Sequence, residues 1–190
     1  MIPIIHRVNT VTQLRKLSDD VGVEVDLRNS ENGLILSHDI NEKAETFEKY
    51  LDYYTKKLLV VNIKETGIEE KAIKNLLQNR ITNFFLLDVE FPFILKNFNT
   101  YGDYLCLRFS AYESIESIKP FCGKIGWLWV DTYNDFDIKK SDVETLKAFK
   151  ICLVSPSRWG SKYGQGHFID KFKKLGLDIN YIMVEESENF

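Results

Sequence analysis

The chain is 190 residues long, 44% of them hydrophobic, and carries a formal net charge of −3 at neutral pH. These values predict one globular domain over residues 1–190 with a sizeable core, and they argue against an intrinsically disordered chain. Both signs of charge are spread along the sequence without a basic stripe, so we expect no nucleic-acid partner. No apolar run approaches the roughly 20 residues of a membrane-spanning helix, and no signal peptide is recognisable. We therefore expect a cytoplasmic location and no transmembrane segment, and the oligomeric state stays open.

Short apolar runs alternate with helical patterns along the chain. Strands are predicted at residues 2–7, 21–28, 58–64, 83–89, 103–110, 125–132, 150–156 and 179–185. Helices are predicted between them at 10–20, 41–56, 67–80, 91–100, 112–120, 140–148 and 166–175. The turn signal Asn32-Gly33 predicts an additional hairpin strand at 33–38.

Eight strands separated by seven helical segments favour parallel βαβ units. We therefore predict an α/β fold, a compact (β/α)8 TIM barrel with eight parallel strands. Such barrels usually have about 250 residues, so this chain would need short loops. An open doubly wound sheet is the alternative, but it does not by itself account for eight strands. The three cysteines, Cys106, Cys122 and Cys152, are odd in number and widely spaced. They predict free thiols, with neither a disulfide nor a zinc site.

Polar residues lie at the ends of the first apolar strands. His6 closes the first strand, Glu24 and Asp26 lie two apart on the second, and His38 closes the hairpin strand. Residues two apart on a strand point to the same face, so the two carboxylates project together. A divalent cation bound through oxygen, Mg²⁺ or Ca²⁺, is the usual way to offset their repulsion. Two histidines beside such a cation supply an acid and a base, which indicates metal-assisted displacement at phosphorus.

The later strands also end in polar residues, and the carboxyl ends of strands carry the functional residues of such barrels. These positions are Asn62, Lys64, Asp88, Arg108, Trp129, Asp131, Ser155, Ser157 and Arg158. Arg7, Lys64 and Arg108 are candidates for holding the anionic oxygens of a phosphate. Their positive charge would also stabilise the extra negative charge of a five-coordinate phosphorus.

Each of these signals has a structural alternative. Glu24 and Asp26 could form ion pairs with Arg7, Arg28 or Lys64 instead of binding a metal. Trp129 fits core packing better than a pocket wall, and residues 155–160 form either a phosphate-binding loop or a simple turn. His167 fits a surface position better than a third catalytic base. Tyr50, Tyr53 and Tyr54 are expected to pack or to face solvent.

An ordered set of short motifs resembles the glycerophosphodiester phosphodiesterases, which belong to the phosphatidylinositol-specific phospholipase C-like barrels. The set is His6-Arg7, Asn9-Thr10, Glu24-x-Asp26, Asn32-Gly33 and His38-Asp39. The resemblance is dense over about the first 40 residues and weakens to Asn62-x-Lys64. It implies a TIM barrel that hydrolyses phosphodiesters with a divalent metal, with His6 and His38 as acid and base. It also implies that Glu24 and Asp26 hold the metal, with Asn62 in the position of the third ligand.

Two departures from the family pattern affect these expectations. The third ligand is usually acidic, whereas Asn62 offers a neutral carbonyl oxygen, so metal binding should be weaker or should recruit Asp88 or Asp39. The segment between His6 and Glu24 is shorter than in the family, so the pocket wall there should be lower.

The leading hypothesis is a phosphodiesterase acting on a small phosphodiester with an alcohol such as glycerol. The alternatives are a metal-independent, phospholipase C-like lyase and a non-catalytic barrel that binds a phosphorylated ligand.

Overall fold

The computed structural model describes residues 1–31, 33–40 and 44–185. The chain divides into two compact units. The N-terminal unit is Ile4–Lys96, and the C-terminal unit combines Met1–Pro3 with the residues from Asn97 onward. The assignment of residues 1–190 to a single domain stays a prediction.

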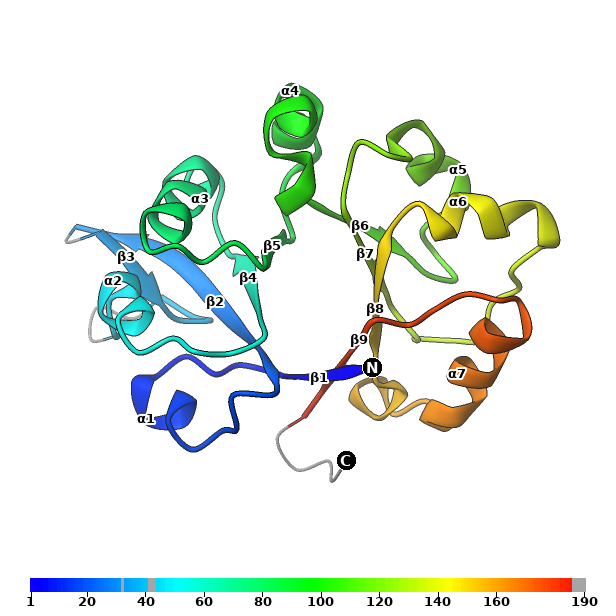
Figure 1. Ribbon diagram of the computed structural model, residues 1–190, viewed down its shortest axis with the longest axis horizontal. Helices are drawn as coiled ribbons and strands as arrows, with labels where there is room; N and C mark the ends of the chain where they lie inside the picture. Colours follow the sequence, from blue (N-terminus) through cyan, green and yellow to red (C-terminus); the bar gives the residue numbers. More distant parts are fainter. Residues whose placement is uncertain (32, 41–43, 186–190) are drawn as a thin grey trace. The chain divides into compact units, whose positions relative to one another are not determined.

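The N-terminal unit is built on parallel strands. Its elements are β1 (Ile2–Ile5, of which Ile4 and Ile5 belong here), α1 (Val11–Leu14), β2 (Gly22–Ser30), β3 (Gly33–Leu36), α2 (Phe47–Leu51), β4 (Leu58–Ile63), α3 (Glu69–Gln78), β5 (Phe84–Leu87) and the start of α4 (Phe91–Tyr101). Strand β2 pairs in parallel with β1 and β4, β4 pairs in parallel with β5, and β3 pairs antiparallel with β2. Helices α1, α2 and α3 lie along one side of these strands (Figure 1).

The strands of the N-terminal unit are apolar on both faces along most of their length. Every residue of β4 and β5 is buried, as a parallel strand covered on both faces requires. The two short helices begin at threonine caps, because the side chains of Thr10 and Thr46 accept hydrogen bonds from Gln13 N and Lys49 N.

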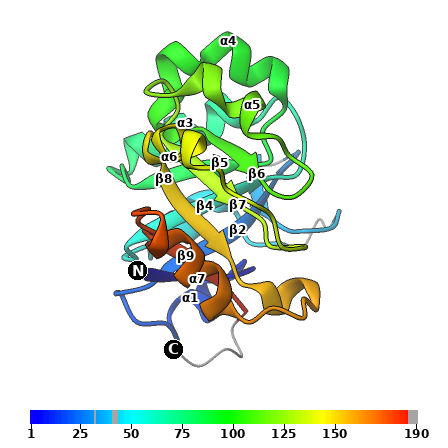
Figure 2. The same ribbon diagram turned by 90° about the vertical axis from the view of Figure 1, so that its right-hand side faces the viewer.

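The C-terminal unit repeats the same plan. Its elements are the rest of α4, η1 (Gly102–Tyr104), β6 (Cys106–Phe109), α5 (Ile115–Ile118), η2 (Lys119–Phe121), β7 (Trp127–Val130), η3 (Lys140–Asp142), α6 (Val143–Lys147), β8 (Lys150–Val154), η4 (Pro156–Trp159), α7 (Gln165–Lys174) and β9 (Tyr181–Val184). Strands β6, β7, β8 and β9 are parallel neighbours in that order. Helices α5, α6 and α7 lie along one side of them, the side that faces the viewer in Figure 2.

The strand order is β5-β4-β2-β1-β9-β8-β7-β6, with β3 attached to β2 outside this path. Sequential parallel strands with helices between them define the (β/α)8 barrel class. The predicted α/β fold is therefore confirmed, and each predicted strand has a counterpart, including the hairpin strand β3. Gly33 has a φ of 117°, which suits a turn that favours glycine, and Asn32 lies outside the described residues.

Two helices are shorter than predicted. The helix predicted over 10–20 ends at Leu14, and the one predicted over 41–56 covers only Phe47–Leu51. Residues 41–43 of the second prediction lie outside the described residues. After α1, the ammonium of Lys56 donates to the Leu17 carbonyl at 2.7 Å and to Asp19 Oδ1 at 2.7 Å. Before this contact, Lys16 N–H donates to Gln13 O and Leu17 N–H donates to Leu14 O, bonds that span three residues instead of four, so the α-helix does not continue.

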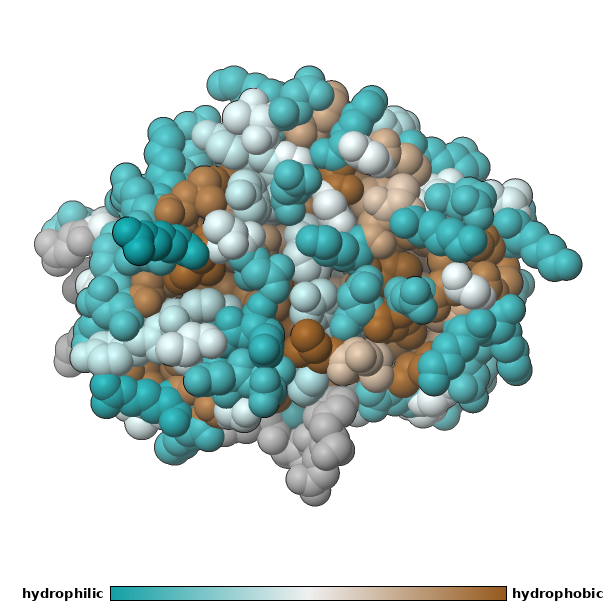
Figure 3. Space-filling model, viewed as in Figure 1, coloured by the Kyte–Doolittle hydropathy of each residue, from teal (hydrophilic) through white to brown (hydrophobic). Residues whose placement is uncertain are grey.

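Polar residues predominate on the face of the molecule shown in Figure 3, and apolar residues form smaller areas between them. Within the described ranges, no helix has both the length and the apolar character that crossing a membrane requires. Cys106, Cys122 and Cys152 form no disulfide with one another.

Candidate functional site

The ends of β2 and β4 bring the predicted metal ligands together in the N-terminal unit. In the parallel register, Asp26 pairs with Asn62 and Glu24 with Val60. The alternation of β2 directs Glu24 and Asp26 to the same side, and both carboxylates are buried, with 1% and 0% of their surface exposed. Lys64 follows the end of β4, where its backbone N–H donates to Leu27 O at 3.0 Å.

Glu24 accepts hydrogen bonds on both of its carboxylate oxygens. The backbone N–H of Arg7 donates to Oε2 at 2.8 Å, and Asn62 Nδ2 donates to Oε1 at 3.1 Å. Burial, followed by the charge of Asp26, raises the pKa of Glu24 to about 7, although these hydrogen bonds and Lys64 act in the opposite direction. Glu24 is therefore an acid that changes its charge near neutral pH in the absence of a cation.

Asp26 is held by an amide and by two cations. Asn9 Nδ2 donates to Asp26 Oδ2 at 2.8 Å, and the Asp26 backbone N–H donates to Asn9 Oδ1 at 2.8 Å. Lys64 Nζ lies 3.0 Å from Oδ1, and Arg7 Nε lies 3.9 Å from Oδ2. The predicted alternative, an ion pair between these cations and Asp26, is thus present.

The backbone after β1 turns sharply beside both carboxylates. Arg7 has a φ of 55°, in the left-handed region that is uncommon for residues other than glycine. The backbone N–H of Val8 donates to Glu24 O at 2.9 Å, next to the bond from Arg7 N–H to the Glu24 side chain. The turn therefore directs backbone donors at β2 while the Arg7 side chain reaches toward Asp26.

The two predicted catalytic histidines have different surroundings. His6 Nε2 lies 3.8 Å from Glu24 Oε2, and the imidazole is 8% exposed. His38 is 41% exposed, and its Nδ1 lies 2.9 Å from Asp39 Oδ1. The backbone N–H of Ser37, the residue before His38, donates to Asp26 O at 2.9 Å. The structure therefore brings the His6 side chain to Glu24, whereas the His38 imidazole contacts Asp39 and neither of the two carboxylates among the described residues.

The oxygen atoms at the end of β4 suit a hard cation. Asn62 Oδ1 and Asp26 Oδ1 are buried, and neither accepts a hydrogen bond of good geometry within the described part of the chain, although Lys64 forms an ion pair with Asp26. Buried oxygens normally have hydrogen-bond partners, so Asn62 Oδ1 is available to coordinate, whereas Asp26 Oδ1 already faces the Lys64 ammonium. Two carboxylates and an amide carbonyl form a donor set typical of Mg²⁺ or Ca²⁺.

The described residues do not support the prediction that Asp88 or Asp39 supplies a third acidic metal ligand. Among the described residues, no group of three or more histidine, cysteine, aspartate or glutamate side chains is placed to hold a metal ion. Asp39 contacts His38 instead, and Asp88 is an exposed residue with a φ of 60°. Any metal site on Glu24 and Asp26 would therefore depend on the neutral oxygen of Asn62.

The remaining polar residues predicted at strand ends belong to the C-terminal unit. Arg108 forms an ion pair with Asp131, which is fully buried and also accepts a hydrogen bond from Trp129 Nε1 at 3.3 Å. Burial is the main reason that the pKa of Asp131 is raised to about 6, and Arg108 opposes the shift. Trp129 is 3% exposed, so core packing is its role, as favoured from the sequence.

The loop after β8 and His167 form contacts of their own. The Ser155 and Ser157 hydroxyls lie 2.8 Å apart, and Arg158 Nη1 lies 2.6 Å from Glu185 Oε1. His167 is 38% exposed and lies 3.1 Å from Asp135, which agrees with its predicted surface position. Tyr50 is buried and Tyr53 is 42% exposed.

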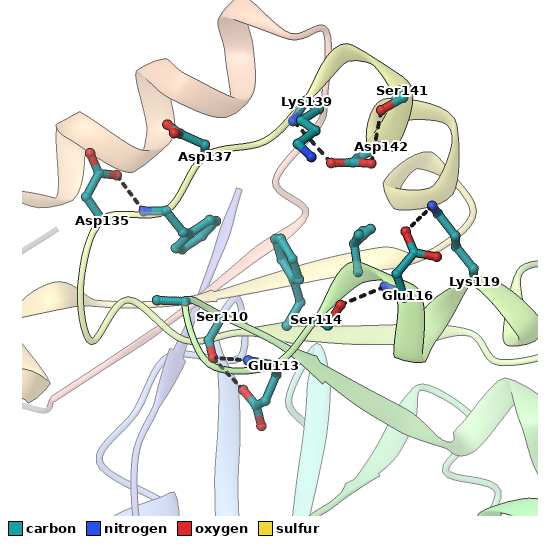
Figure 4. A pocket seen from close by; sticks show the side chains of 14 residues that line it. Ser110, Glu113, Ser114, Glu116, Lys119, Asp135, Asp137, Lys139, Ser141 and Asp142 are labelled. Carbon is teal, nitrogen blue, oxygen red and sulfur yellow. Dashed lines mark hydrogen bonds and ion pairs between the residues drawn. The ribbon is translucent and has the colours of Figure 1, made fainter.

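A separate cavity of about 430 Å³ lies between the segments that follow β6 and β7. Figure 4 shows that Ser110, Glu113 and Glu116 line it from the first segment and that Asp135 and Asp142 line it from the second. Its acidic side chains have local partners: Glu113 accepts from Ser110, and Glu116 pairs with Lys119. The predicted site residues do not line this cavity.

Comparison with solved structures finds proteins of similar architecture. A glycerophosphodiester phosphodiesterase from Agrobacterium tumefaciens str. C58 matches with a TM-score of 0.63 and 10% sequence identity, over 96% of this chain and 95% of that chain. A glycerophosphoryl diester phosphodiesterase from Parabacteroides distasonis ATCC 8503 matches with a TM-score of 0.59 and 12% identity, over 97% and 82% of the two chains. This chain has the fold of the glycerophosphodiester phosphodiesterases. The resemblance predicted from the first 40 residues is confirmed at the level of the fold. No protein-family model and no curated protein matches the sequence.

Two residues near the site have roles that the sequence analysis did not assign. Asn9 holds both the side chain and the backbone of Asp26, and its presence in the Asn9-Thr10 motif was the available signal. Arg28 donates from Nε and Nη2 to His38 O at 3.1 and 2.9 Å. No motif indicates this contact. From the sequence, Arg28 is a candidate only for an ion pair with Glu24 or Asp26.

Proposed function

We propose that the protein is a phosphodiesterase that cleaves a small phosphodiester with an alcohol such as glycerol on one side. One observation supports this most directly: the imidazole of His6 lies 3.8 Å from Glu24, within a buried carboxylate pair flanked by Lys64 and Arg7. A protein that only binds a phosphorylated ligand needs the positive charges. It does not need an imidazole beside a carboxylate whose pKa is raised to about 7, because such a pair serves proton transfer. The fold shared with glycerophosphodiester phosphodiesterases agrees with this reaction class.

In this proposal the side chains divide into three roles. One histidine of the His6/His38 pair removes the proton from the attacking oxygen, and the other gives a proton to the leaving alcohol oxygen. With water as the nucleophile, one P–O bond forms and one breaks, so the products are a phosphomonoester and an alcohol. Lys64 and Arg7 hold the non-bridging oxygens and offset the negative charge that develops on them. The phosphate-binding role of Arg108, which pairs with Asp131 in the C-terminal unit, stays a prediction.

Glu24, Asp26 and Asn62 would hold a divalent cation, Mg²⁺ or Ca²⁺. When bound, the cation would polarise a phosphoryl oxygen. The buried Oδ1 of Asn62, which accepts no hydrogen bond within the described part of the chain, supports this assignment. The cytoplasmic location, the small-molecule substrate and the absence of a nucleic-acid partner stay predictions.

The test is hydrolysis of glycerophosphocholine and glycerophosphoethanolamine by the purified protein, with Mg²⁺, with Ca²⁺ and with EDTA. We expect activity that requires the cation and that falls by about 10²- to 10⁴-fold in His6→Ala and in His38→Ala. His167→Ala is the matched control, because this third histidine pairs with Asp135 in the other unit and should leave the rate unchanged. Activity that survives in both His6→Ala and His38→Ala would exclude the proposed acid–base pair.

A metal-independent lyase is the second candidate, and one contact favours it. Lys64 Nζ lies 3.0 Å from Asp26 Oδ1, so a cation of the protein lies beside one of the proposed metal ligands. A neighbouring hydroxyl of the substrate would then be the nucleophile, and the product would be a cyclic phosphate. Activity in EDTA, no calorimetric heat with Mg²⁺ or Ca²⁺, and a cyclic product in the ³¹P spectrum would together favour this candidate. Binding of glycerol phosphate without turnover would instead indicate a non-catalytic barrel.

A further inference from the structure

Arg28 donates hydrogen bonds to the backbone carbonyls of two predicted functional residues. His38 follows strand β3, and Lys64 follows strand β4. Its Nε and Nη2 donate to the carbonyl of His38 at 3.1 and 2.9 Å, and its Nη1 donates to the carbonyl of Lys64 at 3.4 Å. The side chain is 20% exposed. A single guanidinium therefore bridges the loop after β3 and the end of β4.

The rest of the environment makes Arg28 the connection between these two segments. Lys64 N–H is bound to Leu27 O, and Ser37 N–H is bound to Asp26 O, so β2 holds the amide side of each segment. Arg28 holds the carbonyl side of each. Glu65 lies 3.7 Å from Arg28 Nη1 and accepts from Asn29 N–H at 2.8 Å, which keeps the guanidinium over the strand end.

We infer that Arg28 is a positioning residue, which fixes His38 for proton transfer and Lys64 for binding the phosphate. This inference rests on the proposed function. Arginine suits the task because its planar guanidinium directs several N–H donors at once in a fixed geometry. Lysine carries the same charge on a compact ammonium, so it cannot bridge the two carbonyls in the same way. Arg28 is not one of the ligands or proton-transfer groups, and it acts only through the two residues that it holds.

The first experiment measures kcat and KM for glycerophosphocholine in Arg28→Lys. We expect kcat to fall about 10- to 100-fold, because small misplacements of a catalytic group carry costs of this order, and we expect KM to rise because Lys64 is also displaced. Arg15→Lys is the matched control, since Arg15 is exposed and its guanidinium packs over the ring of Tyr53. Glu65→Gln, which keeps the two contacts to carbonyls, should change kcat far less than Arg28→Lys. Wild-type kinetics in Arg28→Lys would overturn the inference.

The second experiment separates positioning from a general loss of stability. If Arg28 acts on kcat through His38, then Arg28→Lys should lower kcat by a smaller factor in the His38→Ala background than in the wild type, because only the part transmitted through Lys64 remains. A residue that only stabilises the fold would lower the rate, or the folded fraction, by the same factor in both backgrounds. An additive effect on kcat in the double variant would therefore overturn the inference.

A third measurement does not depend on activity, so it distinguishes failure of this inference from failure of the proposed function. Ring ¹H and ¹³C signals of the three histidines are recorded in Arg28→Lys, with assignments from His→Ala variants. We expect the His38 signals to shift and broaden while those of His167 stay in place. This result supports the bridge even if the wild-type protein turns over no phosphodiester. Unchanged His38 signals would contradict the bridge whatever the activity.

Discussion

At the scale of single residues, Glu24 is an ionisable side chain in a buried environment that disfavours its charged form. Its carboxylate is buried beside Asp26, and both effects favour the neutral acid, which is why its pKa rises to about 7. Three neutral or cationic groups compensate in part: the Arg7 N–H, the Asn62 amide and Lys64. Asn62 therefore has two functions, since its Nδ2 supports Glu24 while its Oδ1 stays free.

Asn62→Asp tests both functions of this amide. The change restores an acid in the position of the third ligand but removes the donor to Glu24 and adds a third buried charge. In EDTA, we expect the free energy of unfolding to fall by about 1–3 kcal/mol, the usual cost of leaving a buried polar group unpaired. With Mg²⁺ or Ca²⁺, we expect tighter binding than in the wild type and a larger rise in melting temperature.

Calorimetry with each cation and thermal unfolding with and without EDTA measure the two effects. The matched control is Asn99→Asp, because Asn99 is an exposed residue of α4 and should change neither quantity appreciably. An Asn62→Asp variant that is as stable as the control in EDTA and binds no cation would contradict the assignment of Asn62 to the metal site.

The predictable residues of the site are those whose place depends on strand pattern alone. His6, Glu24, Asp26, Asn62 and Lys64 lie at or near strand ends, and the period of two decides which side chains share a face. The contacts of Asn9 and Arg28 depend on turns instead. Arg7 at φ 55° turns the chain toward β2, and no periodicity in the sequence encodes that conformation. The same reason explains why the pairing of His38 with Asp39 was not predicted.

At the scale of elements, strands were more predictable than helix ends. Strands such as β4 and β5 are short, mostly apolar runs that are buried on both faces, so they are easily recognised in the sequence. Helix α1 ends at Leu14, and beyond it the Leu17 carbonyl accepts a hydrogen bond from Lys56, 39 residues further along the chain. Such tertiary contacts override the local pattern, and a single sequence does not reveal them.

A close approach of two backbone segments in the C-terminal unit gives a prediction at this scale. A Cβ atom at Gly102 would lie within bonding distance of the Lys124 carbonyl oxygen, at 1.8 Å, and Gly126 N–H donates to Gly102 O at 2.9 Å. The side-chain-free surface of Gly102 thus lets η1 pack against the segment before β7. Gly102→Ala should lower the free energy of unfolding by about 3 kcal/mol or more, because backbone must move to relieve the overlap.

Gly166→Ala is the matched control for this prediction. Gly166 lies in the first turn of α7, and a Cβ there meets no heavy atom within 4 Å. Since alanine favours the helix over glycine, this variant should gain about 0.5–1 kcal/mol. Urea unfolding of both variants measures the difference. Equal stabilities of the two variants would mean that Gly102 and Lys124 do not approach as closely as the structure shows.

At the scale of the whole molecule, each unit contains one buried acid with a raised pKa: Glu24 in the N-terminal unit and Asp131 in the C-terminal unit. Burial is the main cause in both. A raised pKa means that the folded protein binds the proton more tightly than the unfolded chain does. These acids therefore stabilise the fold at low pH, and their contribution is lost as the pH rises.

Asp131 gives the sharper test, because it is not one of the proposed metal ligands. Its pKa is about 6 in the folded protein and 3.8 in the unfolded reference, so its contribution is complete below about pH 4 and lost as the pH rises through 6. The shift corresponds to about 3 kcal/mol between those limits. Asp131→Asn resembles the protonated acid and keeps an acceptor for Trp129 and Arg108. We expect this variant to lose most of that pH dependence and to be more stable than the wild type at pH 7.

Asp135→Asn provides a control of opposite sign. The pKa of Asp135 is lowered, chiefly because hydrogen bonds from Lys171 and His167 outweigh its desolvation. Its carboxylate therefore stabilises the fold above its unfolded pKa, and that contribution disappears as the pH falls through the lowered value. Urea unfolding at intervals between pH 4 and pH 7.5 should then show opposite results at pH 7, with Asp131→Asn more stable than the wild type and Asp135→Asn less stable. If Asp131→Asn kept the full wild-type slope between pH 4 and 6, the Asp131 carboxylate would not be buried as the structure places it.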